Sequence, residues 1–209
     1  PYLDKPLADT GALHDVQVDD ASVRVRIVLA YPAAGIVDEM RAALTALIAP
    51  LSGARAVRIE VRWEIPPHKA NARLPHVAGI RNIVAVASGK GGVGKSTMAA
   101  AIAYGLRSYG SSVGLMDADV YGPSIPHLVG ASGRPMARGE RIQPIETNGL
   151  KLMSMGFLLE PDKAVIMRGP MLHGIMQQFL HQVDWGQLDY LVIDLPPGTG
   201  DVPLTLAQS

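Results

Sequence analysis

The sequence predicts an α/β protein with an open parallel sheet, preceded by a small α+β domain. Up to about residue 65, apolar residues alternate with charged ones, which is the pattern of half-buried strands. From about residue 80, the strands are uninterrupted apolar runs that alternate with helical stretches. Such runs are typical of parallel strands buried on both faces. We therefore expect domains over residues 1–65 and 80–209, joined by a linker over 66–79.

The first domain is expected to pack one helix on a short sheet. Alternation with period two predicts strands at residues 23–29 and 56–63. A shorter strand at 14–18 is expected to pair with the first of these through a hairpin at Asp19-Asp20. Between the two longer strands, residues 36–48 carry apolar side chains at helical spacing, which predicts the covering helix.

Two prolines mark the end of this domain. Pro66 and Pro67 stop the last strand, because proline cannot donate to a sheet ladder. In the second domain, we predict strands at 83–87, 113–116 and 190–193, further strands at 150–155 and 165–167, and helices at 98–106 and 170–181. In such an open sheet, ligands bind beyond the carboxyl ends of the strands.

A glycine-rich loop follows the first of these apolar strands. It reads Gly89-Lys90-Gly91-Gly92-Val93-Gly94-Lys95-Ser96-Thr97 and matches the pattern G-x-x-x-x-G-K-[ST]. Backbone N–H groups of such a loop point at phosphate oxygens, and glycine lets the backbone approach them closely. Lys95 would neutralise the β- and γ-phosphates, and the Ser96 hydroxyl would ligate Mg²⁺. The strand before the loop and the helix after it predict the sheet of a P-loop NTPase.

A carboxylate follows the strand at 190–193. Asp194 stands where such a fold holds Mg²⁺ through its water shell. The chain then enters a loop rich in glycine and proline, whose backbone would sense the γ-phosphate. The residues expected to form this switch loop are Pro197, Gly198, Gly200 and Asp201.

Two further carboxylates follow the strand at 113–116. Asp119 is placed to orient an attacking water, and Asp117 to support the metal or Lys95. The alternative is that both carboxylates only cap the loop. Phosphoryl transfer requires positioning and charge neutralisation, so Lys90 is expected to act as a second cation near the phosphates, in cis or from a partner subunit.

Composition excludes several other classes of protein. Nineteen basic and nineteen acidic residues give no net charge, so no overall field attracts nucleic acid or an anionic membrane. No apolar stretch approaches the ~20 residues that cross a bilayer. The sequence has no cysteine, which excludes disulfides and thiolate-ligated metal within it. Its six histidines are scattered, and they are more consistent with ordinary polar positions than with a zinc site.

Four motifs together resemble the Mrp/ApbC family of iron–sulfur cluster carrier ATPases. They are the phosphate loop with Lys90, the Asp117-Ala118-Asp119 and Gly122-Pro123-Ser124 pair, Arg168-Gly169-Pro170-Met171, and Asp194-Leu195-Pro196-Pro197-Gly198-Thr199-Gly200-Asp201. This family belongs to the deviant Walker A class, which also includes the Min and Par positioning ATPases. The first domain is similar to the MIP18-type (DUF59) module. Tyr31-Pro32-Ala33-Ala34 falls where that module often carries a cysteine.

The resemblance implies a cytoplasmic homodimer that sandwiches ATP, with Lys90 reaching the partner's nucleotide and hydrolysis that is weak and switch-like. It assigns Lys95 and Ser96 to phosphate and Mg²⁺, Asp119 to the water, and Asp194 and Asp201 to the metal and the switch loop. It implies a [4Fe–4S] cluster at the dimer interface, held by a Cys-x-x-Cys pair downstream of residue 209. The implied partners are apo iron–sulfur proteins and cluster scaffold proteins, without nucleic acid or membrane.

We expect these residues to be part of a longer polypeptide, because the sequence stops before the strands that should complete the sheet and the base pocket. Two other functions stay open. A positioning ATPase would share the fold but act on DNA or membrane through a basic or amphipathic helix outside these residues. A protein-interaction module with a vestigial nucleotide site would lack ATP binding, against which the intact Lys95 and Asp194 argue.

Overall fold

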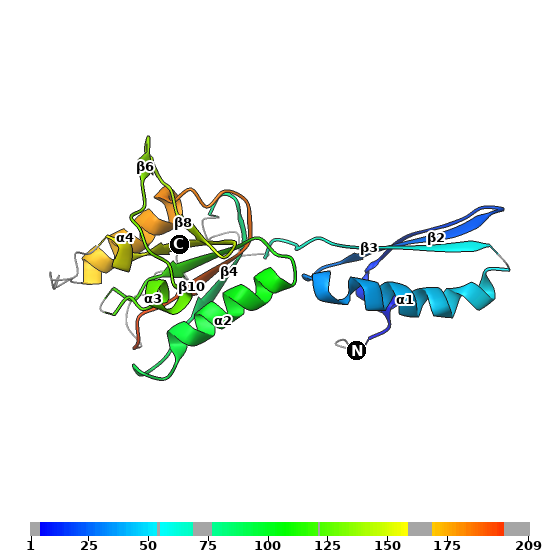
Figure 1. Ribbon diagram of the computed structural model, residues 1–209, viewed down its shortest axis with the longest axis horizontal. Coiled ribbons are helices and arrows are strands. Elements are labelled where there is room, and N and C mark those ends of the chain that lie inside the picture. Colours follow the sequence, from blue (N-terminus) through cyan, green and yellow to red (C-terminus); the bar gives the residue numbers. More distant parts are fainter. Residues whose placement is uncertain (1–4, 54, 69–76, 121, 159–168, 199–209) are drawn as a thin grey trace. The chain divides into compact units, whose positions relative to one another are not determined.

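The computed structural model describes residues 5–53, 55–68, 77–120, 122–158 and 169–198. The chain divides into two compact units (Figure 1). One consists of Pro1–Pro66 with Ser108–Gly110, and the other of Pro67–Arg107 with Ser111–Ser209. Each unit has its own sheet, so each is described separately.

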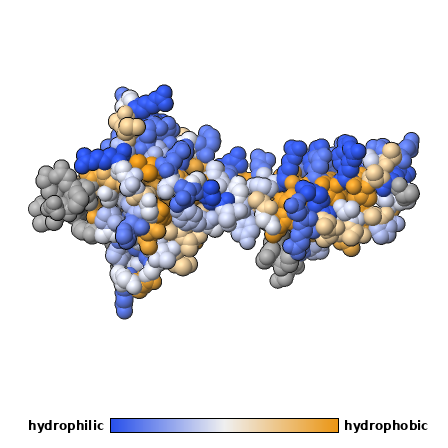
Figure 2. All heavy atoms as spheres, viewed as in Figure 1, coloured by the Kyte–Doolittle hydropathy of each residue, from blue (hydrophilic) through white to orange (hydrophobic). Residues whose placement is uncertain are grey.

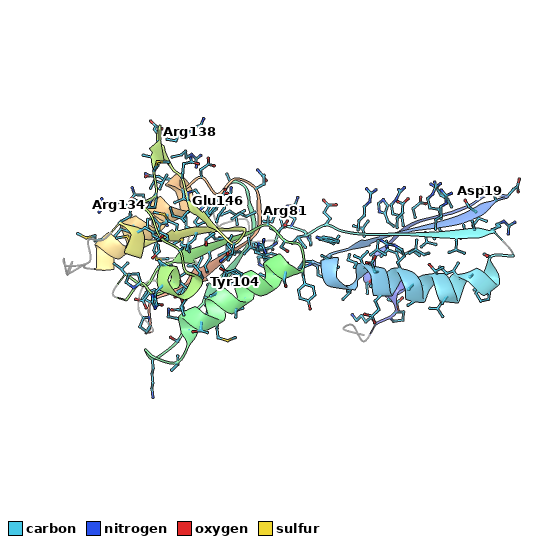
Figure 3. The ribbon with its side chains drawn as sticks, in the orientation of Figure 1. Asp19, Arg81, Tyr104, Arg134, Arg138 and Glu146 are labelled. Atoms are coloured by element: carbon cyan, nitrogen blue, oxygen red, sulfur yellow. The ribbon has the colours of Figure 1, made fainter. Side chains whose placement is uncertain are left out.

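The first unit is a three-stranded sheet with one long helix. Its elements are η1 (Leu7–Thr10), β1 (Leu13–Val18), β2 (Ser22–Leu29), η2 (Ala34–Ile36), α1 (Val37–Ile48), η3 (Ala49–Leu51) and β3 (Ala56–Trp63). β1 and β2 are antiparallel and joined by a tight turn at Asp19, which Figure 3 labels. β2 and β3 are parallel, so α1 is the crossover connection between them. The predicted hairpin, helix and long strands are confirmed.

The core of the first unit lies between α1 and one face of β2 and β3. On that face, Val23, Val25, Ile27 and Leu29 alternate with arginines along β2, and Ile59 and Val61 do the same along β3. Apolar residues of α1, including Met40 and Leu44, pack against them. The opposite face of the sheet therefore carries the polar side chains.

The second unit contains a five-stranded sheet with helices on both faces. Its elements are β4 (Ile80–Val86), α2 (Lys95–Ser108), β5 (Val113–Asp117), α3 (Ile125–Val129), β6 (Ala137–Arg138), β7 (Arg141–Ile142), β8 (Ile145–Thr147), β9 (Leu150–Ser154), η4 (Met155–Phe157), α4 (Gly169–Gln182) and β10 (Leu188–Asp194). The strand order is β4-β10-β5-β9-β8. The first four strands run parallel, and β8 is antiparallel to β9. The predicted α/β class with a sheet rich in parallel strands is confirmed.

Two layers of side chains hold the helices on this sheet. On one face, Met116, Leu191 and Ile193 pack against α4. On the other, Leu115 and Val192 pack against the alanines of α2 and against α3. Because adjacent residues of β5 and β10 point to opposite faces, both strands are buried on both sides, as their apolar runs predicted.

The prediction for the first strand of this sheet was wrong in two respects. β4 begins three residues before the predicted start at 83, and its burial alternates instead of being complete. Within the described residues it is an edge strand, paired with β10 alone, and Ile83 on its outer face is 43% exposed. An apolar run therefore identified the strand but not its place at the edge of this sheet.

One further element begins earlier than predicted, and several short elements were not predicted. α2 starts at Lys95 and not at residue 98, so its first turn includes the lysine and serine of the phosphate loop. The short helix α3, the β6–β7 hairpin and the antiparallel strand β8 were not predicted. They are short, and their sequences lack the periodicity that identifies longer elements. The predicted strand at 165–167 lies outside the described residues.

Candidate functional site

Three strands deliver the predicted site residues to one edge of the second unit's sheet. β4, β10 and β5 are parallel neighbours, and Asp194 at the end of β10 lies in register with Val86 of β4 and Asp117 of β5. The phosphate loop begins at Gly89, three residues after Val86 at the end of β4. The loop, Asp194 and the Asp117–Asp119 segment therefore meet at the carboxyl edge of the sheet, as the parallel topology requires.

The phosphate loop forms an open cradle. Gly92 and Gly94 have φ angles of 76° and 87°, which side-chain-bearing residues rarely adopt. A Cβ built on Gly89, Gly91, Gly92 or Gly94 meets no described atom within 4 Å. Within the described residues, no backbone N–H from Gly89 to Gly94 donates a hydrogen bond. The loop thus presents free donors to open space, which suits a phosphate group.

The Lys95 side chain lies below this cradle among carboxylates. It is only 7% exposed, and its Nζ is 2.6 Å from Asp194 Oδ1 and 3.7 Å from Asp119 Oδ2. Nζ is also 3.4 Å from the Ser96 hydroxyl. The structure therefore brings Lys95, Ser96, Asp119 and Asp194 together from three separate segments of the chain. Their catalytic and metal-binding roles stay predictions.

Asp194 is fully buried and only half satisfied. Its Oδ1 forms the ion pair with Lys95, while its Oδ2 has no hydrogen-bond partner among the described residues. A buried carboxylate oxygen without a partner is costly, which is why such atoms usually bind a water or an ion. Carboxylate and hydroxyl oxygens are ligands that Mg²⁺ prefers. Asp194 Oδ2 and Ser96 Oγ therefore fit a magnesium site.

Asp117 is held inside the protein by three hydrogen bonds. Its Oδ2 accepts from Ser154 Oγ at 3.0 Å and from the Ile125 N–H at 3.2 Å, and its Oδ1 accepts from the Asp119 N–H at 3.1 Å. Burial raises the pKa of the Asp117 carboxyl to about 7, against these hydrogen bonds, and the charge of Asp194 adds to the rise. This geometry resembles the loop-capping alternative more than a direct metal ligand.

Asp119 stands at the opening of the site. Its Oδ1 accepts a hydrogen bond from the Gly122 N–H at 3.3 Å, and its Oδ2 faces Lys95. Its side chain is 13% exposed, in contrast to the fully buried Asp117 and Asp194. Of the three carboxylates, Asp119 is thus the one that solvent can reach.

A cavity of about 400 Å³ joins these groups. It is lined by Ser88, Lys90, Gly91, Gly92, Gly94, Lys95, Ser96, Thr97, Asp119, Gly122, Ser124, His127, Leu128 and Pro197. Gly89 and Val93 belong to the loop but do not line the cavity, and Val93 is exposed. Sequence reasoning missed His127 and Leu128, because the five-residue helix α3 that carries them had no recognisable pattern.

The segment that enters the expected switch loop is anchored to the end of β4 and to Ser88, just before the phosphate loop. The Leu195 N–H donates to Val86 O at 3.0 Å, and the Gly198 N–H donates to Ser88 O at 2.8 Å. Gly198 has a φ of 114°, which requires glycine. Pro197 lines the cavity. Gly200 and Asp201 lie outside the described residues.

Lys90 is the more exposed of the two lysines in the loop. Its side chain has no hydrogen bond or ion pair with any described residue, although its carbonyl accepts a hydrogen bond from Ser88 Oγ at 3.0 Å. The two lysines thus have different surroundings. Lys95 is buried between carboxylates, whereas Lys90 is exposed at the rim of the cavity.

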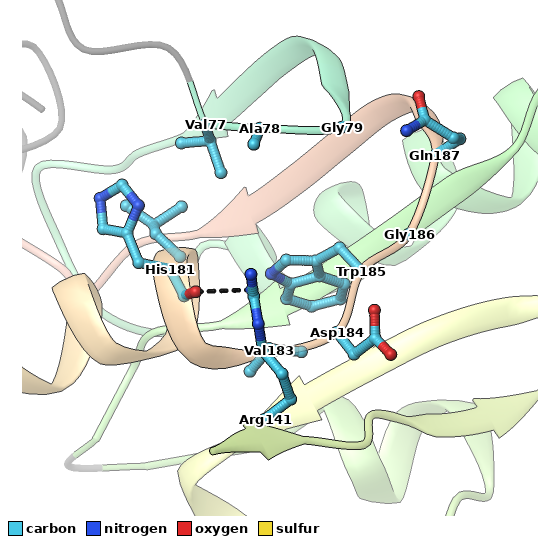
Figure 4. Close-up of a pocket in the computed structure, with 11 residues that line it drawn as sticks. Val77, Ala78, Gly79, Arg141, His181, Val183, Asp184, Trp185, Gly186 and Gln187 are labelled. Atoms are coloured by element: carbon cyan, nitrogen blue, oxygen red, sulfur yellow. Dashed lines mark hydrogen bonds between the residues drawn. The ribbon is translucent and has the colours of Figure 1, made fainter. Parts of the chain in front are cut away.

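A second cavity, of about 540 Å³, lies where β4 and β10 begin (Figure 4). The Arg141 Nη1 donates to the His181 carbonyl at 2.9 Å on its wall. None of the predicted site residues lines this cavity. Among the residues that the structure describes, no group of three or more His, Asp or Glu side chains is arranged to hold a metal ion, and no helix could span a membrane.

Two family models match the chain, one for each unit. A model described as NUBPL iron-transfer P-loop NTPase matches residues 79–209, and one described as iron–sulfur cluster assembly protein matches residues 1–61. A solved structure of a nucleotide-binding protein from Archaeoglobus fulgidus, in complex with ADP and with cobalt, is 47% identical. That similarity covers 63% of this chain and 51% of the other, with a TM-score of 0.55.

Several curated relatives carry the name iron–sulfur cluster carrier protein. One from Synechocystis is 44% identical over the whole chain and 61% of its own length. One from Pseudomonas fragi is 51% identical over 77% of the chain, and one from Escherichia coli K12 is 40% identical over all of it; each is covered over 57% of its length. The chain thus spans about three fifths of these relatives.

Proposed function

Since this chain belongs to the family of NUBPL iron-transfer P-loop NTPases, we propose that it binds and hydrolyses ATP within a carrier that delivers iron–sulfur clusters to apoproteins. The observation that carries the nucleotide part is the position of Lys95. Its ammonium lies at the base of an open glycine cradle, 2.6 Å from Asp194 and 3.7 Å from Asp119. A buried cation in front of free backbone donors is the arrangement that phosphoryl groups bind.

ATP binding would change the partners of Lys95. In the present structure, its charge is neutralised by two carboxylates. The β- and γ-phosphates carry more negative charge than these carboxylates and enter from the cradle side, so Lys95 would turn from Asp119 toward them. Asp119 would then be free to orient a water for attack on the γ-phosphate. ATP binding would thus replace the Lys95–Asp119 ion pair with a contact between Lys95 and phosphate, and so would change the conformation of the loop that carries Asp119.

Mg²⁺ would be held by Ser96 Oγ and by Asp194 through its unpartnered Oδ2. When bound, the ion neutralises charge on the transferring phosphoryl group. Asp117 also remains a predicted support of the metal. Its three hydrogen bonds favour a different contribution, in which it fixes the backbone of Asp119 and the start of α3.

Lys90 is proposed to act across a homodimer. An unpaired lysine at the rim of the cavity is suited to reach a phosphate of a nucleotide bound by a second copy, where it would stabilise transition-state charge as an arginine finger does. Hydrolysis that requires a second copy would be slow and switch-like. The switch loop with Pro197, Gly198, Gly200 and Asp201 would report the γ-phosphate to the rest of the dimer.

In this proposal, the iron–sulfur cluster is the cargo of the carrier. These 209 residues contain no cysteine, so they provide no thiolate ligand for it. We place the thiolates for a [4Fe–4S] cluster outside the 209 residues, in a cytoplasmic protein that receives clusters from scaffold proteins. Its partners would be apo iron–sulfur proteins, and neither nucleic acid nor membrane. The similarity to proteins named iron–sulfur cluster carrier protein supports cluster delivery as the function.

The test is cluster transfer by the product of the whole gene, beside the 209 residues alone. Both are reconstituted with iron and sulfide without oxygen, and iron and sulfide are counted for each dimer. The loaded protein is then mixed with an apo iron–sulfur enzyme, with and without ATP. We expect a cluster in the longer protein and recovery of enzyme activity from it. Absence of a cluster in both proteins would refute the carrier function, while retained ATP hydrolysis would preserve the nucleotide site.

A further inference from the structure

The face of the β1–β3 sheet that points away from α1 carries a cluster of arginines. Apolar residues of β2 and β3 point to the helix, so the alternate positions point the other way. These positions include Arg24 and Arg26 on β2 and Arg58 and Arg62 on β3, which we call the arginine face. Figure 2 shows hydrophilic residues in a row along this side of the unit.

The arrangement of these arginines is unfavourable for the sheet itself. Arg24 lies directly opposite Arg58 in the parallel register, and like charges in that position destabilise a strand pair. Arg26 is opposite Glu60, and their side chains form an ion pair at 3.5 Å. A sheet shaped by stability alone would place opposite charges at both positions. The Arg24–Arg58 pair therefore leaves a local excess of positive charge on this face, which would attract an anionic partner.

Two of the four guanidinium groups are available for such a partner. Arg24 donates to Gln17 Oε1 at 3.2 Å, and Arg26 is engaged by Glu60. Arg58 and Arg62 are exposed, and neither has a side-chain partner among the described residues. Each guanidinium offers five N–H donors in a planar fork that matches a carboxylate.

A hollow of about 510 Å³ lies at one end of the arginine face. It is lined by His14, Arg26, Val28, Arg62, Trp63 and Glu64. Arg26 and Arg62 reach it from neighbouring strands, and Val28 lies opposite Arg62 in the register. Arg26 is already paired with Glu60, and Glu64 adds a carboxylate to the wall, so Arg62 is the arginine of the hollow left without a described partner. A side chain with an apolar stem and a carboxylate tip fits the apolar floor beside Arg62.

The charge pattern favours an acidic protein over nucleic acid or lipid. Acidic residues outnumber basic ones in residues 1–66, so the arginine face does not follow from a basic composition. Asp15, Glu60 and Glu64 lie beside these arginines. Carboxylates within the patch repel a continuous row of phosphates, whereas a protein segment can place its acidic side chains opposite the arginines and leave the other positions neutral.

We propose that the arginine face binds an acidic segment of a partner protein, with one Asp or Glu of that segment in the hollow beside Arg62. Arg58 and Arg62 supply the charge-assisted hydrogen bonds. This interaction does not depend on the nucleotide site or on the cluster.

The test measures fluorescence anisotropy of a short fluorescein-labelled peptide in which Asp and Glu alternate with Gly and Ser. It uses the full chain at about 0.15 M salt, where charges are screened beyond about 8 Å. Replacing Arg58→Gln and Arg62→Gln together should weaken binding at least about tenfold, because each lost charged hydrogen bond accounts for about that factor. Replacing both residues with lysine should give an intermediate affinity, since charge remains but the fork is lost.

The matched control replaces Arg41→Gln and Arg138→Gln. Both are exposed, neither belongs to the arginine face, and the net charge changes by the same amount. Circular dichroism of each variant checks that it is folded. Equal losses in the two double variants, or no peptide binding at this salt concentration, would overturn the proposal. Tighter binding of a duplex RNA or of phosphatidylserine vesicles, with the same dependence on Arg58 and Arg62, would overturn it in favour of that ligand.

Discussion

Lys95 and Asp194 depend on each other before any nucleotide binds. Both side chains are almost fully removed from solvent, and their atoms are 2.6 Å apart. Charges buried this deeply are tolerated only when they are paired. Lys95 is therefore both the expected phosphate ligand and the charge partner of Asp194 in the interior.

Removing this lysine should thus affect stability as well as binding. We expect Lys95→Ala to abolish nucleotide binding and to lower the free energy of unfolding by about 3 kcal/mol or more, because Asp194 is left buried and unpaired. Adding Asp194→Asn to that variant should restore most of the stability but no binding. Urea unfolding and titration with a fluorescent ADP analogue measure the two effects separately.

Lys90→Ala is the natural control, since it removes the same charge from the exposed rim of the same loop. Its free energy of unfolding should change by no more than about 0.5 kcal/mol. If Lys95→Ala proved as stable as Lys90→Ala, the ion pair with Asp194 would not be the stabilising contact that the geometry suggests.

The Asp117 carboxyl should make stability depend on pH. Its pKa is about 7 in the folded protein and about 3.8 when unperturbed, so the folded state keeps this proton to higher pH than the unfolded state. Stability from this group is present below about pH 4 and is lost as pH rises to about 7, by at most about 1.4 kcal/mol per pH unit. Asp117→Asn should remove this slope in urea unfolding between pH 5 and pH 8.

Glu140→Gln, an exposed carboxylate of the same unit, serves for comparison and should keep the slope of the parent protein. The nucleotide is left out, because ligands at Lys95 would shift the charges near Asp117. A slope unchanged by Asp117→Asn would mean that another group produces it.

At the scale of elements, replacement by alanine should have opposite effects on stability at two glycines of the second unit. A Cβ on Gly114, within the central strand β5, would lie 2.7 Å from Leu188 Cδ1 and 2.9 Å from Leu191 Cδ1. A Cβ on Gly105, within α2, meets no described atom within 4 Å. The first glycine is thus required by packing, whereas the second only lowers the helix propensity of its segment.

Gly114→Ala should therefore destabilise the second unit by about 1 to 3 kcal/mol, because the buried leucines must move. Gly105→Ala should stabilise it by up to about 1 kcal/mol. The test compares the midpoints of urea unfolding of the two variants and the parent protein. Destabilisation by Gly105→Ala would show that α2 is packed more tightly on that side than the structure has it.

The spacing of apolar residues identified the long helices and strands of both units. Each of these elements is buried on one face or on both, and either kind of burial leaves a recognisable pattern in the sequence. This spacing did not identify α3, β8 or the β6–β7 hairpin, which are too short to show a period. The exact start of α2 was also missed, since the phosphate loop and the first helical turn share Lys95 and Ser96. These two residues owe their positions to a helix that begins inside the motif.

At the scale of the whole molecule, the chain offers one tryptophan reporter for each unit. Trp63 closes β3 of the first unit, and Trp185 is buried in the second. A non-hydrolysable ATP analogue at 100-fold excess over its dissociation constant should stabilise the unit that binds it by about 2.7 kcal/mol. In thermal unfolding, we expect the transition reported by Trp185 to rise and that reported by Trp63 to stay unchanged.

The variants Trp63→Phe and Trp185→Phe assign each fluorescence signal to its unit. Equal shifts of both transitions would contradict the assignment of nucleotide binding to the second unit alone.

The family resemblance read from the motifs is confirmed by the matched family models and by relatives 40–51% identical. Dimerisation, cluster loading and the individual site roles stay proposals.

The sequence by itself determined the order of the elements, the phosphate loop and the carboxylates at strand ends. These features are local: a motif, a strand and the residue that follows it are read from adjacent positions. Parallel strands then bring Val86, Asp117 and Asp194 to one edge, so the place of the site followed from its fold class.

Tertiary structure alone decided which contacts those residues make. It paired Lys95 with a carboxylate ninety-nine positions away, and it surrounded Asp117 with three donors from three segments. It placed β4 at the edge of the described sheet, and it set Arg24 beside Arg58. The physical reason is that periodicity tells which face of an element is buried, whereas strand order and register, which depend on the whole chain, decide which charges meet.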